Sequence, residues 1–218
     1  MKEKILLIGG GLHCKSCIDV IEQEGRFEIK GIIDLKERLG SSILGYPVIA
    51  TDEDIPELAK ECPNFFITVG DVNSFALRKK IFVKLKEYGL KPPAIISPLA
   101  YVSKHSVVGE GTILFPFTVV DIETTIGNNC IINHGAILAH EVTVGDNCHI
   151  SGNCAVGKST IGHDTFIGAN TFVNNGIEIA PYSIIGAGSV VIRSITEPGV
   201  YAGNPARKIK DILVTVTC

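Results

Sequence analysis

Two adjacent residues in the second half of the chain, His140 and Glu141, have the side chains best suited to acid–base chemistry. Imidazole titrates near neutral pH, so His140 can accept a proton from a reacting group. A neighbouring carboxylate can orient the ring and stabilise its charged form. Taken alone, the pair also fits a surface histidine beside a solvated glutamate, so its role depends on the element that carries it.

A glycine-rich segment near the start, Gly9-Gly10-Gly11, could cradle a phosphate between a strand and a helix. The dinucleotide-binding pattern would require glycine at positions 9, 11 and 14, but position 14 is Cys14. The domain around it is also too short for the two-half dinucleotide fold. These observations argue against an NAD-dependent oxidoreductase.

Cys14 and Cys17 have the spacing of a redox or metal half-site, but no second pair follows at suitable spacing. The chain has seven cysteines, and an odd count fits poorly with a complete disulfide framework. We therefore expect mostly free thiols, with these two half-buried on a helix and no metal site.

Composition excludes several classes of protein. The 218 residues are 45% hydrophobic and 20% charged, with a formal net charge of −3, which predicts a folded core and no nucleic-acid footprint. The basic stretch Arg78-Lys79-Lys80 fits a solvated helix face. We find no secretory signal and no apolar run of membrane-spanning length, and so predict a cytoplasmic protein without membrane partners.

The first 95 residues have the pattern of a small α/β domain with a Rossmann-like parallel sheet. Short apolar runs predict strands, and apolar residues at helical spacing predict helices between them. The expected strands are Lys4–Ile8, Ile29–Ile33, Pro47–Ala50 and Phe65–Val69, and the expected helices are Cys14–Glu24 and Ser74–Tyr88.

Residues 96–218 follow a different rule, because aliphatic residues recur every six positions. Sixteen positions fit this register, with one step of five between Val156 and Ile161. They are Val102, Val108, Leu114, Val120, Ile126, Ile132, Leu138, Val144, Ile150, Val156, Ile161, Ile167, Val173, Ile179, Ile185 and Val191. A fixed period over this length predicts a solenoid.

Each six-residue unit supplies a short strand and a corner, and three units make one triangular coil. The aliphatic residue then points inward, and a small residue four positions later fits where the corner narrows. Glycines that follow the aliphatic positions, such as Gly127 and Gly145, would serve unusual backbone angles. Residues eighteen apart should stack, which makes Cys130 and Cys148 small core fillers.

The chain resembles the bacterial sugar O- and N-acetyltransferases related to the sialic-acid O-acetyltransferases and the bacillosamine-pathway N-acetyltransferase. The resemblance rests on residues 5–13, residues 131–162 and the tail 199–207. It implies an α/β domain that binds a nucleotide sugar, then a left-handed parallel β-helix. It also implies a homotrimer with acetyl-CoA in the groove between neighbouring subunits.

The resemblance assigns roles within the β-helix. His140 matches the family's general base, which takes a proton as a sugar amine or hydroxyl attacks the thioester, and Glu141 matches the acidic residue after it. The cofactor contacts are expected at His149, Gly157, Ala169 and Ala187. The backbone N–H of Gly157 would be a donor to the thioester oxygen in the transition state, while an exposed strand histidine is an equally good interpretation of His149.

The resemblance also implies that the glycine-rich loop binds the nucleotide sugar. The expected substrate contacts are His13, Cys14, Lys15, Asp34, Leu35 and Gly70. Some family members have two acidic residues at the positions of Asp34 and Leu35, so the leucine leaves the nucleotide open. An ordinary turn glycine is the alternative interpretation of Gly70.

The function expected from these features is N-acetylation of a nucleotide-linked 4-amino-4,6-dideoxy sugar, UDP-linked by preference. Sialic-acid-type O-acetylation fits the same features and is the alternative. A zinc hydratase on the same fold would need three ligand histidines, and His134, His140 and His149 do not have that spacing. A non-catalytic scaffold would leave His140, Glu141 and His149 unexplained.

Overall fold

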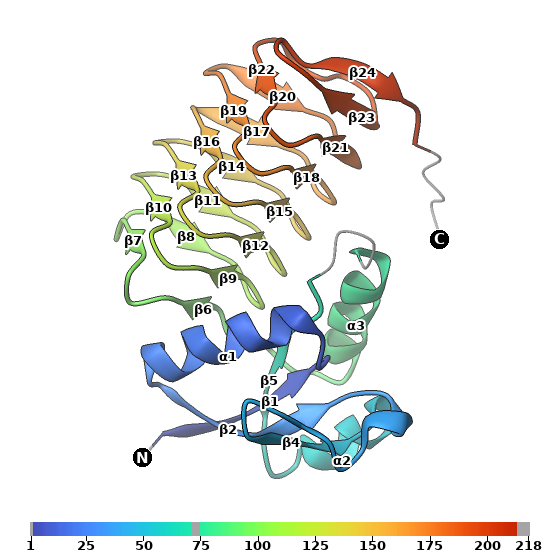
Figure 1. Cartoon of the computed structure of the whole chain (residues 1–218). Coiled ribbons are helices and arrows are strands. Elements are labelled where there is room, and N and C mark those ends of the chain that lie inside the picture. Colours follow the sequence, from blue (N-terminus) through green and yellow to red (C-terminus); the bar gives the residue numbers. More distant parts are fainter. Residues whose placement is uncertain (1, 71–74, 213–218) are drawn as a thin grey trace. The chain divides into compact units, whose positions relative to one another are not determined.

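The computed structural model describes residues 2–70 and 75–212, which form two compact units, Met1–Ser97 and Pro98–Cys218 (Figure 1). The boundary falls two residues after the one expected from the sequence. Within the described residues, no helix has the length and apolar character needed to cross a membrane.

The first unit is a five-stranded sheet in the order β3-β4-β2-β1-β5, with helices packed on it. Strands β4, β2, β1 and β5 run parallel, and β3 pairs antiparallel with β4. The elements are β1 (Glu3–Ile8), α1 (Leu12–Glu24), β2 (Phe27–Ile33), η1 (Lys36–Arg38), β3 (Ser42–Ile43), β4 (Tyr46–Ala50), η2 (Asp52–Asp54), α2 (Ile55–Leu58), β5 (Asn64–Ile67), α3 (Phe75–Glu87) and β6 (Ile95–Ile96).

The predicted strands and helices of this unit are all present, with small differences at their ends. Helix α1 begins at Leu12 and not at Cys14, because Gly11 is its N-cap and the exposed Leu12 breaks the apolar spacing. It ends where Gly25 takes a left-handed φ of 74° and donates to the Ile21 carbonyl. The predicted first residue of α3, Ser74, lies outside the described residues.

The prediction of a wholly solvated basic face on α3 was wrong for one residue. Arg78 is only 5% exposed, and its Nη1 donates to the carbonyls of Ile67 and Val69 at 2.6 and 2.9 Å. Ile67 is the last residue of β5 and Val69 lies just beyond it, so the guanidinium satisfies carbonyls where this strand ends. Lys80 remains exposed as expected.

The second unit is a left-handed parallel β-helix whose coils stack along one axis (Figure 1). Its three walls have the strand orders β22-β19-β16-β13-β10-β7, β20-β17-β14-β11-β8 and β24-β23-β21-β18-β15-β12-β9. The strands are β7 (Tyr101–Val102), β8 (Val107–Val108), β9 (Ile113–Leu114), β10 (Val119–Val120), β11 (Thr125–Ile126), β12 (Ile131–Ile132), β13 (Ile137–Leu138), β14 (Thr143–Val144), β15 (His149–Ile150), β16 (Ala155–Val156), β17 (Ser159–Ile161), β18 (Phe166–Ile167), β19 (Phe172–Val173), β20 (Ile177–Ile179), β21 (Ser183–Ile185), β22 (Val190–Val191), β23 (Gly199–Ala202) and β24 (Arg207–Lys210).

The six-residue register is confirmed, because every predicted aliphatic position lies in one of these strands. Strands one coil apart pair in parallel with partners eighteen residues apart, as in Val120 with Leu138. The short step changes this spacing to seventeen for one coil, as in His149 with Phe166, and eighteen returns above it. Cys130 and Cys148 are buried core fillers, and six cysteines of the described part are free thiols.

The glycines after the aliphatic positions have a different role from the one expected. Gly127 and Gly145 do not have positive φ angles. A Cβ on Gly145 would instead lie 2.6 Å from the backbone nitrogen of His163, one coil away, so glycine here permits close stacking of coils. Most non-glycine residues with a left-handed φ in this unit are asparagines or acids at the corners, such as Asn170 with a φ of 58°.

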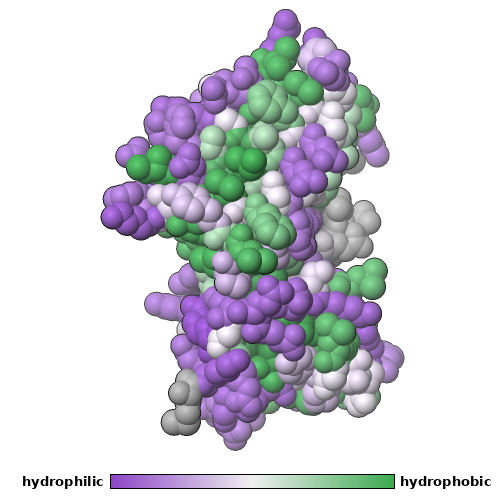
Figure 2. Space-filling view, turned by 60° about the vertical axis from the view of Figure 1, so that its left-hand side comes forward, coloured by the Kyte–Doolittle hydropathy of each residue, from purple (hydrophilic) through white to green (hydrophobic). Residues whose placement is uncertain are grey.

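The outer faces of two walls differ in character. The outward residues of the first wall are all apolar: Tyr101, Val119, Ile137, Ala155, Phe172 and Val190. Those of the second wall include the consecutive exposed threonines Thr125, Thr143 and Thr160. Figure 2 shows apolar side chains gathered on one side of this unit, between hydrophilic patches.

Candidate functional site

The corner that follows β13 carries the His140–Glu141 pair. Glu141 takes a left-handed φ of 59°, which turns the chain from the first wall to the second. The exposed side chains meet at 3.3 Å, His140 Nδ1 to Glu141 Oε1. Since the carboxylate accepts from Nδ1–H, Nε2 is the ring atom left to accept a proton in this tautomer.

A third charged residue joins this pair from the next coil. Lys158 Nζ donates to Glu141 Oε2, so the carboxylate lies between an ammonium and an imidazole. The hydrogen bond from Lys158 and then that from His140 lower the pKa of the Glu141 carboxyl. Sequence reasoning missed Lys158, although it lies in the one short step of the repeat.

The predicted cofactor contacts fall on two different walls. Gly157 follows β16 of the first wall and lies one coil above Ala139, the residue before His140. His149 lies on the third wall, and Ala169 and Ala187 follow strands of that wall. His149 is only 8% exposed and its ring packs edge-to-face on Phe166 at 5.2 Å. One chain therefore does not gather these residues around His140.

The proposed oxyanion role of Gly157 is not supported by the structure. Its backbone N–H donates to the Val173 carbonyl at 2.9 Å as part of the ladder between coils. A donor used in this way is not free to bind a developing negative charge. A Cβ at this position would lie 2.2 Å from Asn175 Oδ1 and 3.1 Å from the Asn175 backbone nitrogen, so the Asn175 side chain would have to move.

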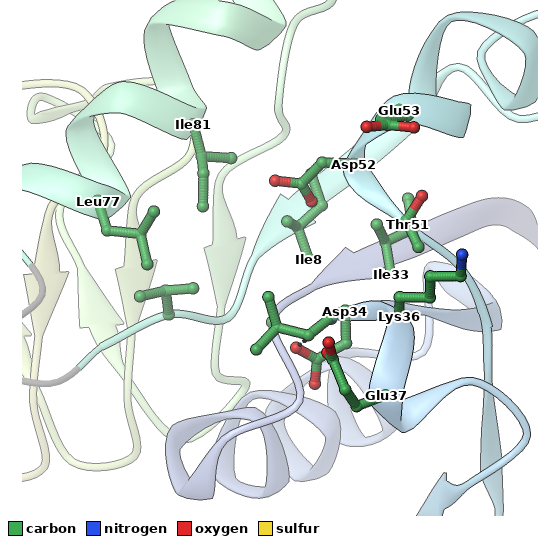
Figure 3. A pocket seen from close by; sticks show the side chains of 13 residues that line it. Ile8, Ile33, Asp34, Lys36, Glu37, Thr51, Asp52, Glu53, Leu77 and Ile81 are labelled. Carbon is green, nitrogen blue, oxygen red and sulfur yellow. Dashed lines mark hydrogen bonds between the residues drawn. The ribbon is translucent and has the colours of Figure 1, made fainter.

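The loops after β1, β2 and β4 in the first unit enclose a cavity of about 490 Å³. Gly9, Asp34 and Leu35 line it together with Thr51 and Asp52. Figure 3 shows the Asp52 carboxylate directed into this space, with Leu77 and Ile81 of α3 forming an apolar wall. Ligands of parallel α/β sheets bind at this carboxyl end of the strands.

Asp34 fixes the shape of the glycine-rich loop. Its Oδ2 accepts from the Gly10 backbone N–H at 3.0 Å and pairs with Arg38 Nη1 at 2.8 Å. Its Oδ1 accepts from the Leu35 N–H at 2.8 Å. A contact with a nucleotide would use the remaining lone pairs of this carboxylate.

Lys15 and Arg38 line a second cavity of about 460 Å³ beside the same loop, together with Gly10 and Gly11. Two cations and a glycine backbone at the start of α1 suit an anionic group such as a diphosphate. The acidic first cavity and the basic second cavity meet at the loop after β1.

Of the other predicted substrate residues, Cys14 is buried and Gly70 lies against the ring of His13. Cys14 is fully buried, so its thiol cannot touch a ligand in the loop, and burial raises the pKa of this thiol. Cys17 is also fully buried, which corrects the expectation of half-buried thiols. Gly70 permits a close approach, because a Cβ there would lie 2.2 Å from Cδ2 of the His13 ring.

A second histidine–acid pair exists in the β-helix at another corner. His163 Nδ1 lies 2.7 Å from Asp164 Oδ2, and the ring packs edge-to-face on Tyr182. Among residues 2–70 and 75–212, no group of three His, Cys, Asp or Glu side chains is placed to hold a metal ion.

Comparisons with known proteins identify both halves of the chain. Residues 4–85 match the PglD N-terminal domain, and residues 123–158 and 158–193 match the six-repeat bacterial transferase hexapeptide. A galactoside O-acetyltransferase of Escherichia coli is 43% identical over 53 residues, which is 24% of this chain and 26% of that protein. The match therefore spans about a quarter of the length of that curated relative.

Solved structures match over almost the whole chain. A variant of perosamine N-acetyltransferase from Caulobacter crescentus, in complex with CoA and GDP-perosamine, is 30% identical with a TM-score of 0.89, covering 95% of this chain and 97% of that one. The acetyltransferase domain of PglB from Neisseria gonorrhoeae, in complex with acetyl coenzyme A, is 26% identical with a TM-score of 0.85, covering 96% and 100%.

Proposed function

Because this chain belongs to the family of hexapeptide-repeat sugar acetyltransferases with a PglD-type N-terminal domain, we propose that it acetylates the 4-amino group of a nucleotide-linked 4-amino-4,6-dideoxy sugar. Acetyl-CoA is the acetyl donor, in keeping with the CoA and acetyl-CoA complexes of the two solved relatives. The observation that carries the proposal is the exposed imidazole of His140, held by a carboxylate at a β-helix corner.

The reaction is a direct attack of the sugar amine on the thioester carbonyl. A C–N bond forms, the C–S bond breaks, and His140 Nε2 takes the proton that the amine loses. Glu141 holds Nδ1 and stabilises the imidazolium. The proton then passes to the departing thiolate, which returns the ring to its neutral form.

The two cavities of the first unit support nucleotide binding there. The basic cavity with Lys15 and Arg38 suits the diphosphate, and the acidic cavity suits the base and ribose, whose N–H and O–H groups donate to carboxylates. Leu35 adds an apolar surface to the lining of the acidic cavity. His13, held in place beside Gly70, lies at the start of α1 next to this loop.

The hydrogen-bond donors of the base narrow the choice of nucleotide. The sequence favours UDP, but uracil offers a carboxylate only one N–H donor. Guanine offers two adjacent donors, which match a carboxylate such as Asp52 in its cavity. The relative from Caulobacter crescentus was solved with GDP-perosamine. We therefore propose a GDP-linked acceptor ahead of a UDP-linked one.

A homotrimer completes the proposed enzyme. The apolar outer face of the first wall would be exposed in a single chain, and closed symmetric assemblies cover such faces. Packing neighbours on this face supplies His149, Ala169 and Ala187 from one subunit to the groove beside His140 of another.

The test is product analysis with a panel of acceptors. GDP-, UDP- and dTDP-linked 4-amino-4,6-dideoxy sugars and a sialic acid are each incubated with acetyl-CoA, and products are measured by mass spectrometry. We expect one acetyl group on an amino sugar, with the highest kcat/KM for the GDP form. Acetylation of the hydroxyl acceptor alone would replace this proposal with the O-acetyltransferase alternative.

A further inference from the structure

The corner above Glu141 lacks one residue. In the regular corner after β13, the buried Val142 comes four positions after Leu138, and Glu141 occupies the left-handed position before it. In the next coil, Ser159 takes the buried place only three positions after Val156, and Thr160, which the period assigned there, is exposed. The missing residue is therefore the one that would stack directly on Glu141.

This deletion places Lys158 over the pair. Residues eighteen apart stack at this corner, so His140 lies between Ile122 in the coil below and Lys158 in the coil above. The Lys158 backbone is fixed on both sides: its N–H donates to Asn175 Oδ1 at 3.0 Å and its carbonyl accepts from Gly176. From this base the side chain reaches down to Glu141.

We propose that Lys158 is a positioning residue that holds the Glu141 carboxylate against Nδ1 of His140 and opposes protonation of the ring. The inference rests on the proposed function and deepens it. A carboxylate alone favours the charged imidazolium, which cannot act as a base. An ammonium on the other carboxylate oxygen draws negative charge away from the ring and opposes that effect.

Other charged groups at this corner come from the coil below. Glu123 lies one coil beneath Glu141, and Asp121 precedes Ile122, where its Oδ1 accepts from the Ile122 N–H. Both are acids, so they too favour a charged His140. In the coil above, Asn174 and Asn175 are neutral. Two other cations share this corner at a greater distance, since Lys104 lies two coils below His140 and Arg193 three coils above it. Lys158 is the cation that contacts the pair.

The first test titrates His140 in the free protein and needs no substrate. NMR of histidine Cε1–H signals, with His140 assigned by its loss in His140→Ala, gives the ring pKa in the wild type, Lys158→Met and Lys158→Arg. We expect the His140 pKa to rise by about half a pH unit in Lys158→Met and to stay near the wild-type value in Lys158→Arg. Glu141→Gln should move the pKa in the opposite direction.

Two controls test whether a change in the His140 titration is specific to the loss of Lys158. His163, the other histidine paired with an acid, should titrate identically in all variants, because Lys158 does not lie beside it. The exposed Lys210 at the end of β24, on the third wall of the same unit, gives the matched variant Lys210→Met, which should leave His140 unchanged. An unaltered His140 titration in Lys158→Met overturns the inference, whatever the enzyme acetylates.

The kinetic test separates positioning from simple binding. In Lys158→Met, the acidic limb of the pH profile of kcat/KM should move up by the same half unit, and Lys158→Arg should restore it. A raised KM for acetyl-CoA with an unmoved profile would mean that Lys158 binds a cofactor phosphate, and the inference fails. If no acceptor is acetylated at all, the proposed function fails, but the titration still decides the role of Lys158.

Discussion

At the scale of single residues, the two histidine–acid pairs of the β-helix look alike in isolation. His140 and His163 each direct Nδ1 at the carboxylate of the next residue, at 3.3 and 2.7 Å. What differs is their surroundings: Lys158 completes the first pair, and Tyr182 packs against the second. Residue type and adjacency therefore do not distinguish the proposed base from the other histidine, but the surroundings in the coil do.

Replacing His140 by alanine removes the proposed proton acceptor while leaving an exposed corner that packs little. We expect kcat to fall by about 10²- to 10⁴-fold, with an unchanged melting temperature. His163→Ala is the matched control, since it removes an imidazole from an equivalent acid pair on another corner. Steady-state kinetics at saturating acetyl-CoA measure both. Near-normal kcat in His140→Ala would mean that another group accepts the proton.

The sequence located candidate residues by type but did not reveal which of their atoms are already used. It pointed to Gly157 and Cys14, yet the amide of one is bonded within the ladder and the thiol of the other is buried. Such commitments depend on partners many residues away, as in the bond between Gly157 and Val173. Asp52 and Lys158 were missed for the same reason, because only the fold brings them to a cavity or to Glu141.

At the scale of elements, the β-helix was predictable because one buried contact repeats in every unit. The six-residue period identified each inward aliphatic residue from Val102 to Val191, and the coil follows from them. The first unit lacks such redundancy. Its hairpin β3–β4 was not fully predicted, since the two-residue β3 contains one exposed serine, Ser42, and one buried isoleucine.

The corners offer a direct test of backbone geometry. Asn170 is exposed and has a φ of 58°, which a β-branched residue adopts only at a cost. We expect Asn170→Val to reduce the free energy of unfolding by about 1–2 kcal/mol, and Asn170→Gly to change it much less. Urea denaturation compares the variants. Equal losses in both would show that the asparagine side chain, and not its backbone angle, stabilises this corner.

At the scale of the whole molecule, the contrast between two walls predicts which face associates. Phe172 and Ile137 are 44% and 46% exposed on the apolar first wall, while Thr160 is exposed on the second. A charge placed in an apolar interface loses its hydration without a partner. The proposed trimer therefore depends on the first wall.

The matched variants are Phe172→Arg and Thr160→Arg. We expect Phe172→Arg to shift the protein to smaller species in sedimentation velocity and to reduce acetyltransferase activity, because the proposed cofactor contacts lie on a different wall from His140. Thr160→Arg should retain the wild-type size. If both variants sediment as the wild type does, the first wall is not the interface.

The single shortened corner has a consequence for how such enzymes diversify. Pairing drops from eighteen to seventeen residues for one coil and then returns to eighteen, so the loss of an amino acid is absorbed within one turn. The strands on either side keep their inward aliphatic residues and their neighbours. A solenoid of this kind can therefore hold a shorter bend, with different side chains at it, without changing the register of the coils on either side.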